Sequence, residues 1–161
     1  MTKPPLLIVW HSRTGASATT ARSAAEGAGG AGRMLPCEEA QAGDFLAAQG
    51  YLFCGPENLA ALSGAMKEML DRLYYPLLGQ IEGRAYASII AAGSDGSGAQ
   101  RQLDRIATGW RLRRVAEPLL VNLQAQTPEA ILAVKTVPSE VRAQCRELGA
   151  GLAEGLSQGL F

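Results

Sequence analysis

The stretch that most constrains this chain is residues 6–17, where five large apolar residues are followed directly by a loop rich in hydroxyl groups. A continuous apolar run is typical of a strand covered on both faces, as in a parallel sheet. The Ala-rich sequence that follows favours a helix over residues 15–28, and Thr14, Ser17 or both are expected to cap its first turn. The stretch therefore predicts a buried strand, a tight turn and a helix.

The turn between that strand and that helix has the features of an anion site. The first N–H groups of a helix have no partner within it, and the helix dipole adds partial positive charge there. The hydroxyls of Ser12, Thr14 and Ser17 supply further donors, and Gly15 lets the backbone approach a ligand closely. This pattern indicates a phosphate monoester. The alternative is an ordinary capped connection without a ligand, because hydroxyl residues are common at helix caps.

Residues 12–17, SRTGAS, resemble the phosphate loop of the flavodoxin family, which is usually written S-x-T-G-x-T. In that family the loop holds the 5′-phosphate of FMN. Trp10 stands where the family often has Tyr or Phe, and Ser17 replaces the final Thr but keeps its hydroxyl. The loop matches neither a Walker A motif nor the dinucleotide fingerprint G-x-G-x-x-G. The resemblance implies that the phosphate is bound by Ser12, Arg13, Thr14, Gly15, Ala16 and Ser17.

A second match lies at residues 54–72, CGPENLAALSGAMKEMLDR, which resembles the end of the family's third strand and the helix that follows it. We expect a strand at 51–54 that Gly55 and Pro56 stop, and a helix over 59–75. Apolar residues at helical spacing, including two Met, predict a core-facing stripe on that helix rather than a cofactor contact. The resemblance implies that one edge of the flavin ring is held by Gly55, Pro56, Glu57, Asn58 and Leu59.

A third loop, GSDGSG at 93–98, lies between a strand predicted at 85–92 and a helix predicted at 99–110. Its three glycines would let backbone N–H groups converge on a flat ligand, although a flexible surface turn is the alternative. Ligands of doubly wound sheets lie outside the carboxyl ends of the strands. The loop is similar to that of the larger quinone and flavin reductases. The other ring edge is therefore assigned to Gly93, Ser94, Asp95, Gly96, Ser97 and Gly98.

The remaining pattern completes one α/β domain over residues 1–161. Short strands are predicted at 33–36 and at 115–121, the latter interrupted by Pro118, and a last helix at 139–156 follows a polar connection at 122–137. Right-handed crossovers then give a flavodoxin-like three-layer sandwich with a five-stranded parallel sheet in the order 2-1-3-4-5.

Composition excludes several classes of function. Lys plus Arg equals Asp plus Glu at 15 each, which gives no support to nucleic-acid binding. We expect no membrane insertion and a cytoplasmic location, because the chain shows neither a signal peptide nor a long apolar run. Three Cys without metal-type spacing are expected to be reduced and buried. A single His excludes a multi-His metal site, so no metal is predicted.

The resemblance implies FMN as cofactor, and three hypotheses follow for its use. The first is an oxidoreductase that takes hydride from NAD(P)H and reduces a quinone or free flavin. The second is an electron-transfer flavodoxin that serves a redox protein. The third is a flavodoxin-fold module that has lost the flavin, since no aromatic residue stands in either ring loop and the Glu57 carboxylate would repel a reduced flavin. A homodimer that covers the exposed ring is a further possibility, and no catalytic residue is assigned.

Overall fold

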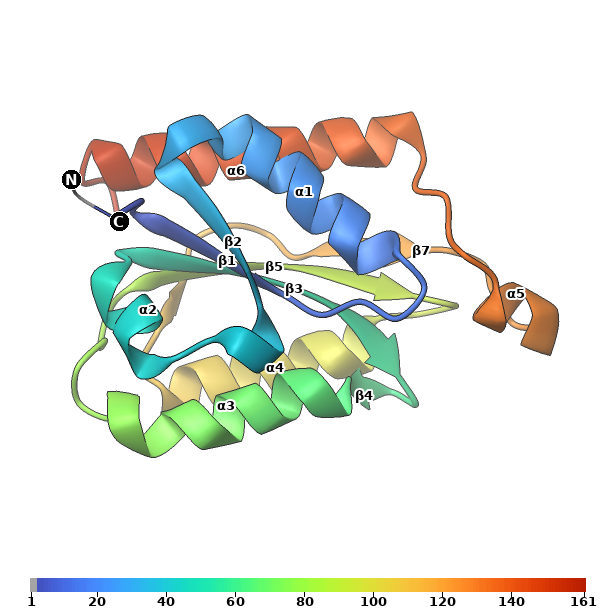
Figure 1. Ribbon diagram of the computed structural model, residues 1–161, viewed down its shortest axis with the longest axis horizontal. Coiled ribbons are helices and arrows are strands. Elements are labelled where there is room, and N and C mark those ends of the chain that lie inside the picture. Colours follow the sequence, from blue (N-terminus) through green and yellow to red (C-terminus); the bar gives the residue numbers. More distant parts are fainter. Residues whose placement is uncertain (1–2) are drawn as a thin grey trace.

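The apolar run near the amino terminus forms β1 (Leu6–Trp10), the inner strand around which the computed structural model of this protein is built; the structure describes residues 3–161 (Figure 1). Leu6, Ile8 and Val9 are fully buried. Strand β1 pairs in parallel with β2 (Gly32–Pro36) on one side and with β3 (Gly50–Asn58) on the other. This confirms the buried parallel strand that the continuous apolar run predicts.

The sheet runs in the order β2-β1-β3-β5-β6, and β7 also pairs with β5. All of these pairings are parallel, whereas β4 adds a short antiparallel pair to β3. The predicted order 2-1-3-4-5 is confirmed, with β5 as the fourth strand and β6 and β7 sharing the fifth place. The other elements are α1 (Ala16–Ala28), η1 (Gly29–Ala31), η2 (Cys37–Glu39), α2 (Ala42–Ala47), β4 (Ala61–Leu62), α3 (Gly64–Leu77), β5 (Ala85–Ala92), α4 (Ser97–Gly109), β6 (Arg113–Arg114), β7 (Leu119–Asn122), α5 (Pro128–Leu132) and α6 (Ser139–Ser157).

The region after residue 54 differs from the prediction. Strand β3 does not stop at Gly55 and Pro56 but continues to Asn58, and the chain folds back so that Glu57 pairs with Leu62. The helix predicted from residue 59 therefore begins only at Gly64. Local helical spacing could not show this later start, because the pairing of Glu57 with Leu62 and of Asn58 with Ala61 places the expected first helical turn in a hairpin.

The predicted strand at 115–121 is in fact two short strands. Strand β6 pairs with Ala85 and Tyr86, and β7 pairs with the last four residues of β5. Pro118 lies between them and has no N–H to donate to a ladder, so it separates the two pairings. The connection predicted as polar and irregular at 122–137 contains the short helix α5. The last helix lies almost where predicted.

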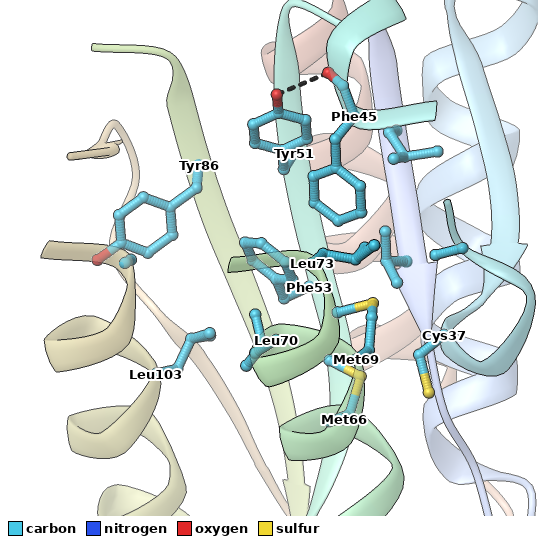
Figure 2. Packing of buried hydrophobic residues seen from close by; sticks show 14 of the residues in the cluster. Cys37, Phe45, Tyr51, Phe53, Met66, Met69, Leu70, Leu73, Tyr86 and Leu103 are labelled. Atoms are coloured by element: carbon cyan, nitrogen blue, oxygen red, sulfur yellow. Dashed lines mark hydrogen bonds between the residues drawn. The ribbon is translucent and has the colours of Figure 1, made fainter. Parts of the chain in front are cut away.

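Helices cover both faces of the sheet, with α1 and α6 on one side and α3 and α4 on the other (Figure 1). Met66, Met69 and Leu70 of α3 are buried against the sheet, as the apolar stripe predicts (Figure 2). In the same core, Tyr51 donates its hydroxyl proton to the carbonyl of Phe45 at 2.8 Å. The core on the α1 and α6 side is built largely of small and aliphatic residues.

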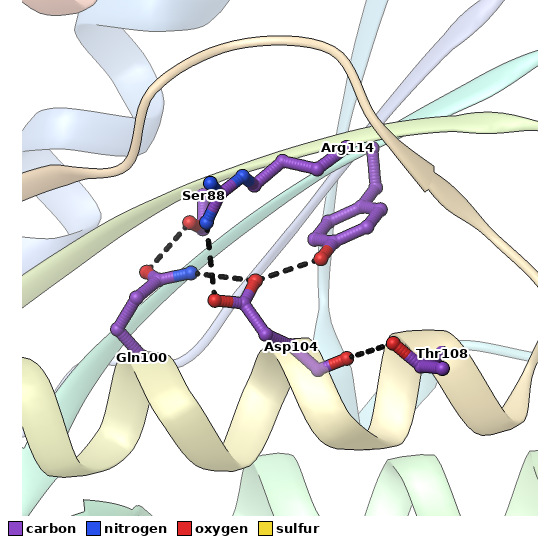
Figure 3. A network of polar contacts seen from close by, with 6 residues as sticks. Ser88, Gln100, Asp104, Thr108 and Arg114 are labelled. Carbon is purple, nitrogen blue, oxygen red and sulfur yellow. Dashed lines mark hydrogen bonds and ion pairs between the residues drawn. The ribbon is translucent and has the colours of Figure 1, made fainter.

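A polar network fastens the middle of α4 to the sheet (Figure 3). Asp104 accepts a 2.7 Å hydrogen bond from the Tyr86 hydroxyl, and its other oxygen lies 3.2 Å from Arg114 Nη1. Burial, reinforced by the Asp104 carboxylate, raises the pKa of Tyr86. One turn earlier, buried Gln100 accepts from Ser88 Oγ of β5 at 2.7 Å. These contacts fix the helix whose amino end lies beside the carboxyl end of β5.

The three cysteines are free and buried, as predicted. Burial is the main cause that raises the pKa of each thiol, to about 12 for Cys37 and to about 11 for Cys145, and well above the usual range for Cys54. Thiols in this state carry little thiolate and are unreactive.

Candidate functional site

A cleft of about 620 Å³ opens at the carboxyl ends of β1, β3 and β5. Three of its walls come from loops that the sequence singles out, and the fourth comes from the segment after β7. The lining residues are Ser12, Arg13, Thr14, Ala16, Ser17, Pro56, Glu57, Asn58, Leu59, Ala60, Ala91, Ala92, Gly93, Ser94, Leu123, Ala125, Ile131, Leu132 and Lys135.

The turn after β1 is shaped by Gly15, which is the N-cap of α1 and has a φ of 100°. This left-handed conformation favours glycine because a Cβ would be strained there. Ser12 Oγ accepts the Gly15 N–H at 3.1 Å and so tightens the turn. The prediction that Thr14 or Ser17 caps the helix is wrong, since no side chain caps its first turn.

Ser17 is the most informative residue of this turn. Its side chain is buried, yet its hydroxyl has no hydrogen-bond partner among the described residues. Buried polar atoms almost always have a partner, and an orphan calls for an explanation. Beside it lies the amino end of α1, whose first amides have no partner within the helix. An orphaned donor next to unpaired amides at the edge of a cleft fits the phosphate of FMN.

The wall from β3 and β4 ends in a two-residue hairpin turn. Leu59 and Ala60 both have positive φ, at 52° and 65°. Hairpin turns of this kind normally use Asn and Gly, because two successive left-handed residues are strained with a Cβ. The Leu59 side chain is wholly exposed at the edge of the cleft. The turn therefore holds an apolar side chain in solvent next to the candidate ligand space.

The glycine-rich loop after β5 is built differently from the prediction. The N–H groups of Gly96 and Ala99 donate to the two carboxylate oxygens of Glu57, at 3.0 and 2.9 Å. The Ser97 N–H donates to Asp95 Oδ1 at 3.2 Å. These amides are thus satisfied by carboxylates of the protein itself and are not directed at a ligand.

Two glycines of this loop are required by backbone packing. A Cβ on Gly98 would lie 2.3 Å from the Ala60 carbonyl oxygen, and one on Gly93 would lie 2.5 Å from that of Ala125. The loop is therefore pressed against the β3–β4 hairpin on one side and against the segment after β7 on the other.

Most of the predicted binding residues from the first two loops line the cleft, but the third loop contributes only its first two. The predicted residues that do not line it are Gly15, Gly55, Asp95, Gly96, Ser97 and Gly98. Gly55 lies inside β3, where a Cβ would approach Met66 Cγ to 3.2 Å.

Sequence reasoning missed the segment after β7, which contributes Leu123, Ala125, Ile131, Leu132 and Lys135 to the cleft. The Lys135 N–H donates to the carbonyl of Thr14 at 2.8 Å, which binds this segment to the candidate phosphate turn, residues 11–15 between β1 and α1. Its ammonium group donates to the carbonyls of Ile131 and Ala133. The sequence feature that could have indicated this fourth wall is the apolar run at 131–134, whose residues are exposed in the structure.

His11 directly follows β1 and is not among the residues that line the cleft. Its Nδ1 is 2.8 Å from Ser63 Oγ, and its Nε2 is 3.7 Å from Glu38 Oε1. Ser63 is fully buried and also caps α3 by accepting the Met66 N–H, so it has no access to a substrate. Burial lowers the pKa of His11 and Arg13 lowers it further, while Glu38 opposes them.

This lowered pKa predicts a pH dependence of stability. The unfolded chain takes up a proton on His11 near its ordinary pKa, whereas the folded protein does so only at lower pH. The free energy of unfolding is therefore expected to fall as the pH drops below the ordinary histidine value, until the folded pKa is passed. Urea denaturation at a series of pH values should show this slope in the wild type and a flatter one in His11→Gln. Equal slopes would contradict the assignment.

In the part of the chain that the structure describes, no group of three His, Cys, Asp or Glu side chains is placed to hold a metal ion. No helix of residues 3–161 is both long enough and apolar enough to cross a bilayer.

No family model matches the sequence. A curated flavodoxin from Aquifex aeolicus strain VF5 is 28% identical over 158 residues, which spans 92% of this chain and 85% of that protein.

Solved structures show the same fold at low sequence identity. A flavodoxin from the domain Archaea has a TM-score of 0.77 and 13% identity, covering 94% of this chain and 98% of that one. A WrbA-like flavodoxin from Agrobacterium tumefaciens has a TM-score of 0.71 and 19% identity, covering 95% and 97%. The rubredoxin oxygen:oxidoreductase of Desulfovibrio gigas matches 99% of this chain with only 38% of its own length, at a TM-score of 0.75 and 16% identity.

Proposed function

We propose, from the premise that this chain is a flavodoxin-like protein, that it binds FMN in the cleft and uses it to transfer electrons. The observation that carries the proposal is the buried, unpartnered Ser17 hydroxyl beside the free amides of α1. An ordinary capped turn would have no reason to bury an unsatisfied donor there. The cofactor, once bound, supplies one- and two-electron redox chemistry, and the protein supplies binding and orientation.

Each wall of the cleft has a task under this proposal. Thr14, Ser17 and the first amides of α1 bind the phosphate, while Ser12 holds the turn in shape. The residues at 56–60 and at 93–94 line the space available to the ring. Glu57 lines the cleft, but both of its carboxylate oxygens accept hydrogen bonds from N–H groups at the amino end of α4, where the helix dipole favours negative charge.

More specifically, we propose that the protein is an oxidoreductase in which NAD(P)H reduces the flavin and a quinone or free flavin reoxidises it. No aromatic residue is among the described residues that line the cleft, so these residues give the ring no aromatic stacking partner. The exposed apolar side chains of Leu59 and Leu132 at its rim suit a flat, apolar acceptor. A homodimer that covers the open ring face stays a prediction, to be tested by sedimentation.

The second candidate is an electron-transfer flavodoxin that serves a redox protein. It is favoured by the likeness in fold to flavodoxins over almost their whole length, at 94% of this chain and 98% of the archaeal protein. The zero net charge weighs against it, because a neutral surface gives no long-range attraction to a charged partner.

An absorption spectrum of freshly purified protein tests FMN binding, which both candidate functions require. We expect flavin bands, or their appearance with saturable binding when FMN is added to the apoprotein. Colourless protein that ignores FMN would overturn the proposal and favour the third hypothesis, a module without flavin. Oxidation of NAD(P)H that depends on added quinone would support the oxidoreductase. A long-lived semiquinone without NAD(P)H turnover would support the electron carrier.

A further inference from the structure

We propose that Glu57 is a positioning residue that joins the β3–β4 hairpin to the amino end of α4, so that these two parts of the cleft wall move as one body. The bridge is present in the protein without ligand. Its effect on ring binding rests on the proposed FMN function.

The bridge is long-range and uses both carboxylate oxygens. Glu57 Oε1 accepts from Gly96, 39 residues away, and Oε2 accepts from Ala99, 42 residues away. Gly96 is the N-cap of α4 and has no side chain of its own to bond the helix amides. Glu57 therefore performs the capping from another element, and its negative charge lies at the positive end of the helix dipole.

The hairpin needs such an anchor because its turn is strained. Leu59 and Ala60 both adopt left-handed backbone conformations without being glycine. Strained turns persist only where the surrounding structure fixes them. Here Glu57 fastens one strand of the hairpin, and Gln102 of α4 fastens the other by accepting the Leu62 N–H at 2.7 Å.

The two parts also fit together at the backbone. The bare Cα of Gly98 faces the Ala60 carbonyl, where a Cβ would come within 2.3 Å. Further along α4, the Asp104 network fixes the helix to β5 (Figure 3). Glu57 thus ties a strained, exposed turn to a helix that is already rigid, which holds Asn58 and Leu59 at the edge of the cleft.

Amide hydrogen exchange by NMR on the cofactor-free protein tests the bridge. In Glu57→Gln, one amide loses its acceptor, because a side-chain NH₂ then faces a backbone N–H. We expect exchange to accelerate by about tenfold or more at whichever of Gly96 and Ala99 loses its acceptor, and exchange at Leu62 across the hairpin to accelerate with it. The matched control is Glu140→Gln, which removes an exposed carboxylate from the first turn of α6 without cutting a bridge. It should change none of these rates.

Ligand titrations test the consequence for the ring. Glu57→Gln should weaken FMN binding by roughly tenfold, the equivalent of one charge-assisted hydrogen bond. It should leave unchanged the shift of the Ser17 amide signal on adding inorganic phosphate, because the phosphate turn is untouched. An equal loss for both ligands would show a general disturbance and overturn the positioning role.

The outcomes separate this proposal from the proposed function. Faster exchange at Gly96 or Ala99 with unchanged protection of Leu62 would reduce Glu57 to a local cap and overturn the bridge. Wild-type protein that binds no FMN would overturn the proposed function, while the exchange comparison would still decide the bridge. If Glu57→Gln does not fold, Glu57→Asp, which keeps the charge on a shorter stem, should show the same order of effects. Unchanged protection at Leu62 in that variant would also contradict the proposal.

Discussion

Replacing Ser17 with alanine is expected to weaken FMN binding by about 10- to 100-fold without destabilising the protein, and even to stabilise it. The hydroxyl is buried and has no partner among the described residues of the ligand-free structure. Its removal therefore breaks no hydrogen bond and eliminates the cost of burying an unsatisfied polar group. In the complex the same hydroxyl would donate to a phosphate oxygen, a bond to a charged group worth about 1.5–3 kcal/mol. Fluorescence titration with FMN and urea denaturation in phosphate-free buffer measure the two effects.

Thr20→Val is the matched control for Ser17→Ala. Thr20 lies one turn further along α1, is equally buried, and its hydroxyl already donates to the Ser17 carbonyl at 2.9 Å. This variant should lose about 1 kcal/mol of stability and leave FMN affinity unchanged. If Ser17→Ala instead lowers stability and keeps full FMN affinity, the hydroxyl serves the fold and the phosphate assignment fails.

Gly149→Ala is expected to destabilise the fold strongly, by about 3 kcal/mol. Helices α1 and α6 cross so closely that a Cβ at Gly149 would lie 1.9 Å from the carbonyl oxygen of Ala24. The opposing glycine, Gly27, faces the Arg146 carbonyl at the same distance. Because both obstacles are backbone atoms, no side chain can rotate away, and one helix has to move. Thermal unfolding should show a decrease in Tm of about 10 °C for a chain of this size.

Gly151→Ala provides the comparison within the same helix. Gly151 is exposed, and a Cβ there would meet nothing within 4 Å. The alanine variant should therefore gain about 0.5–1 kcal/mol through helix propensity alone. Equal Tm values for the two variants would show that the α1–α6 crossing tolerates a methyl group and that its glycines are not required.

The turn after β1 shows how far local sequence can predict the backbone of a candidate site. The strand, the turn and the helix at residues 6–28 are neighbours along the chain, so apolar run, glycine and hydroxyl spacing together indicate the arrangement. The detail that failed was the cap. Which hydroxyl bonds which amide depends on a left-handed Gly15 that the pattern permits but does not require.

The ring-side loops show where local sequence stops being sufficient. The pattern at 93–98 suggested amides free for a ligand, but the N–H groups of Gly96 and Ser97 are bonded to Glu57 and Asp95. Local spacing predicted a helix from residue 59, where the structure has the hairpin at 57–62. The antiparallel pairing of the hairpin and its contact with α4 outweigh the local preference for helix.

Periodicity and residues close together in the chain were sufficient to predict the parallel α/β architecture and the turn after the first strand, whereas the strand order was predicted from right-handed crossovers and the family resemblance. The packed structure was needed to show that Glu57, a residue of the cleft wall, accepts hydrogen bonds at both oxygens from the amino end of α4, and that residues 123–135 form the fourth wall. Those contacts join residues far apart in sequence, and their geometry exists only once the helices have packed on the sheet.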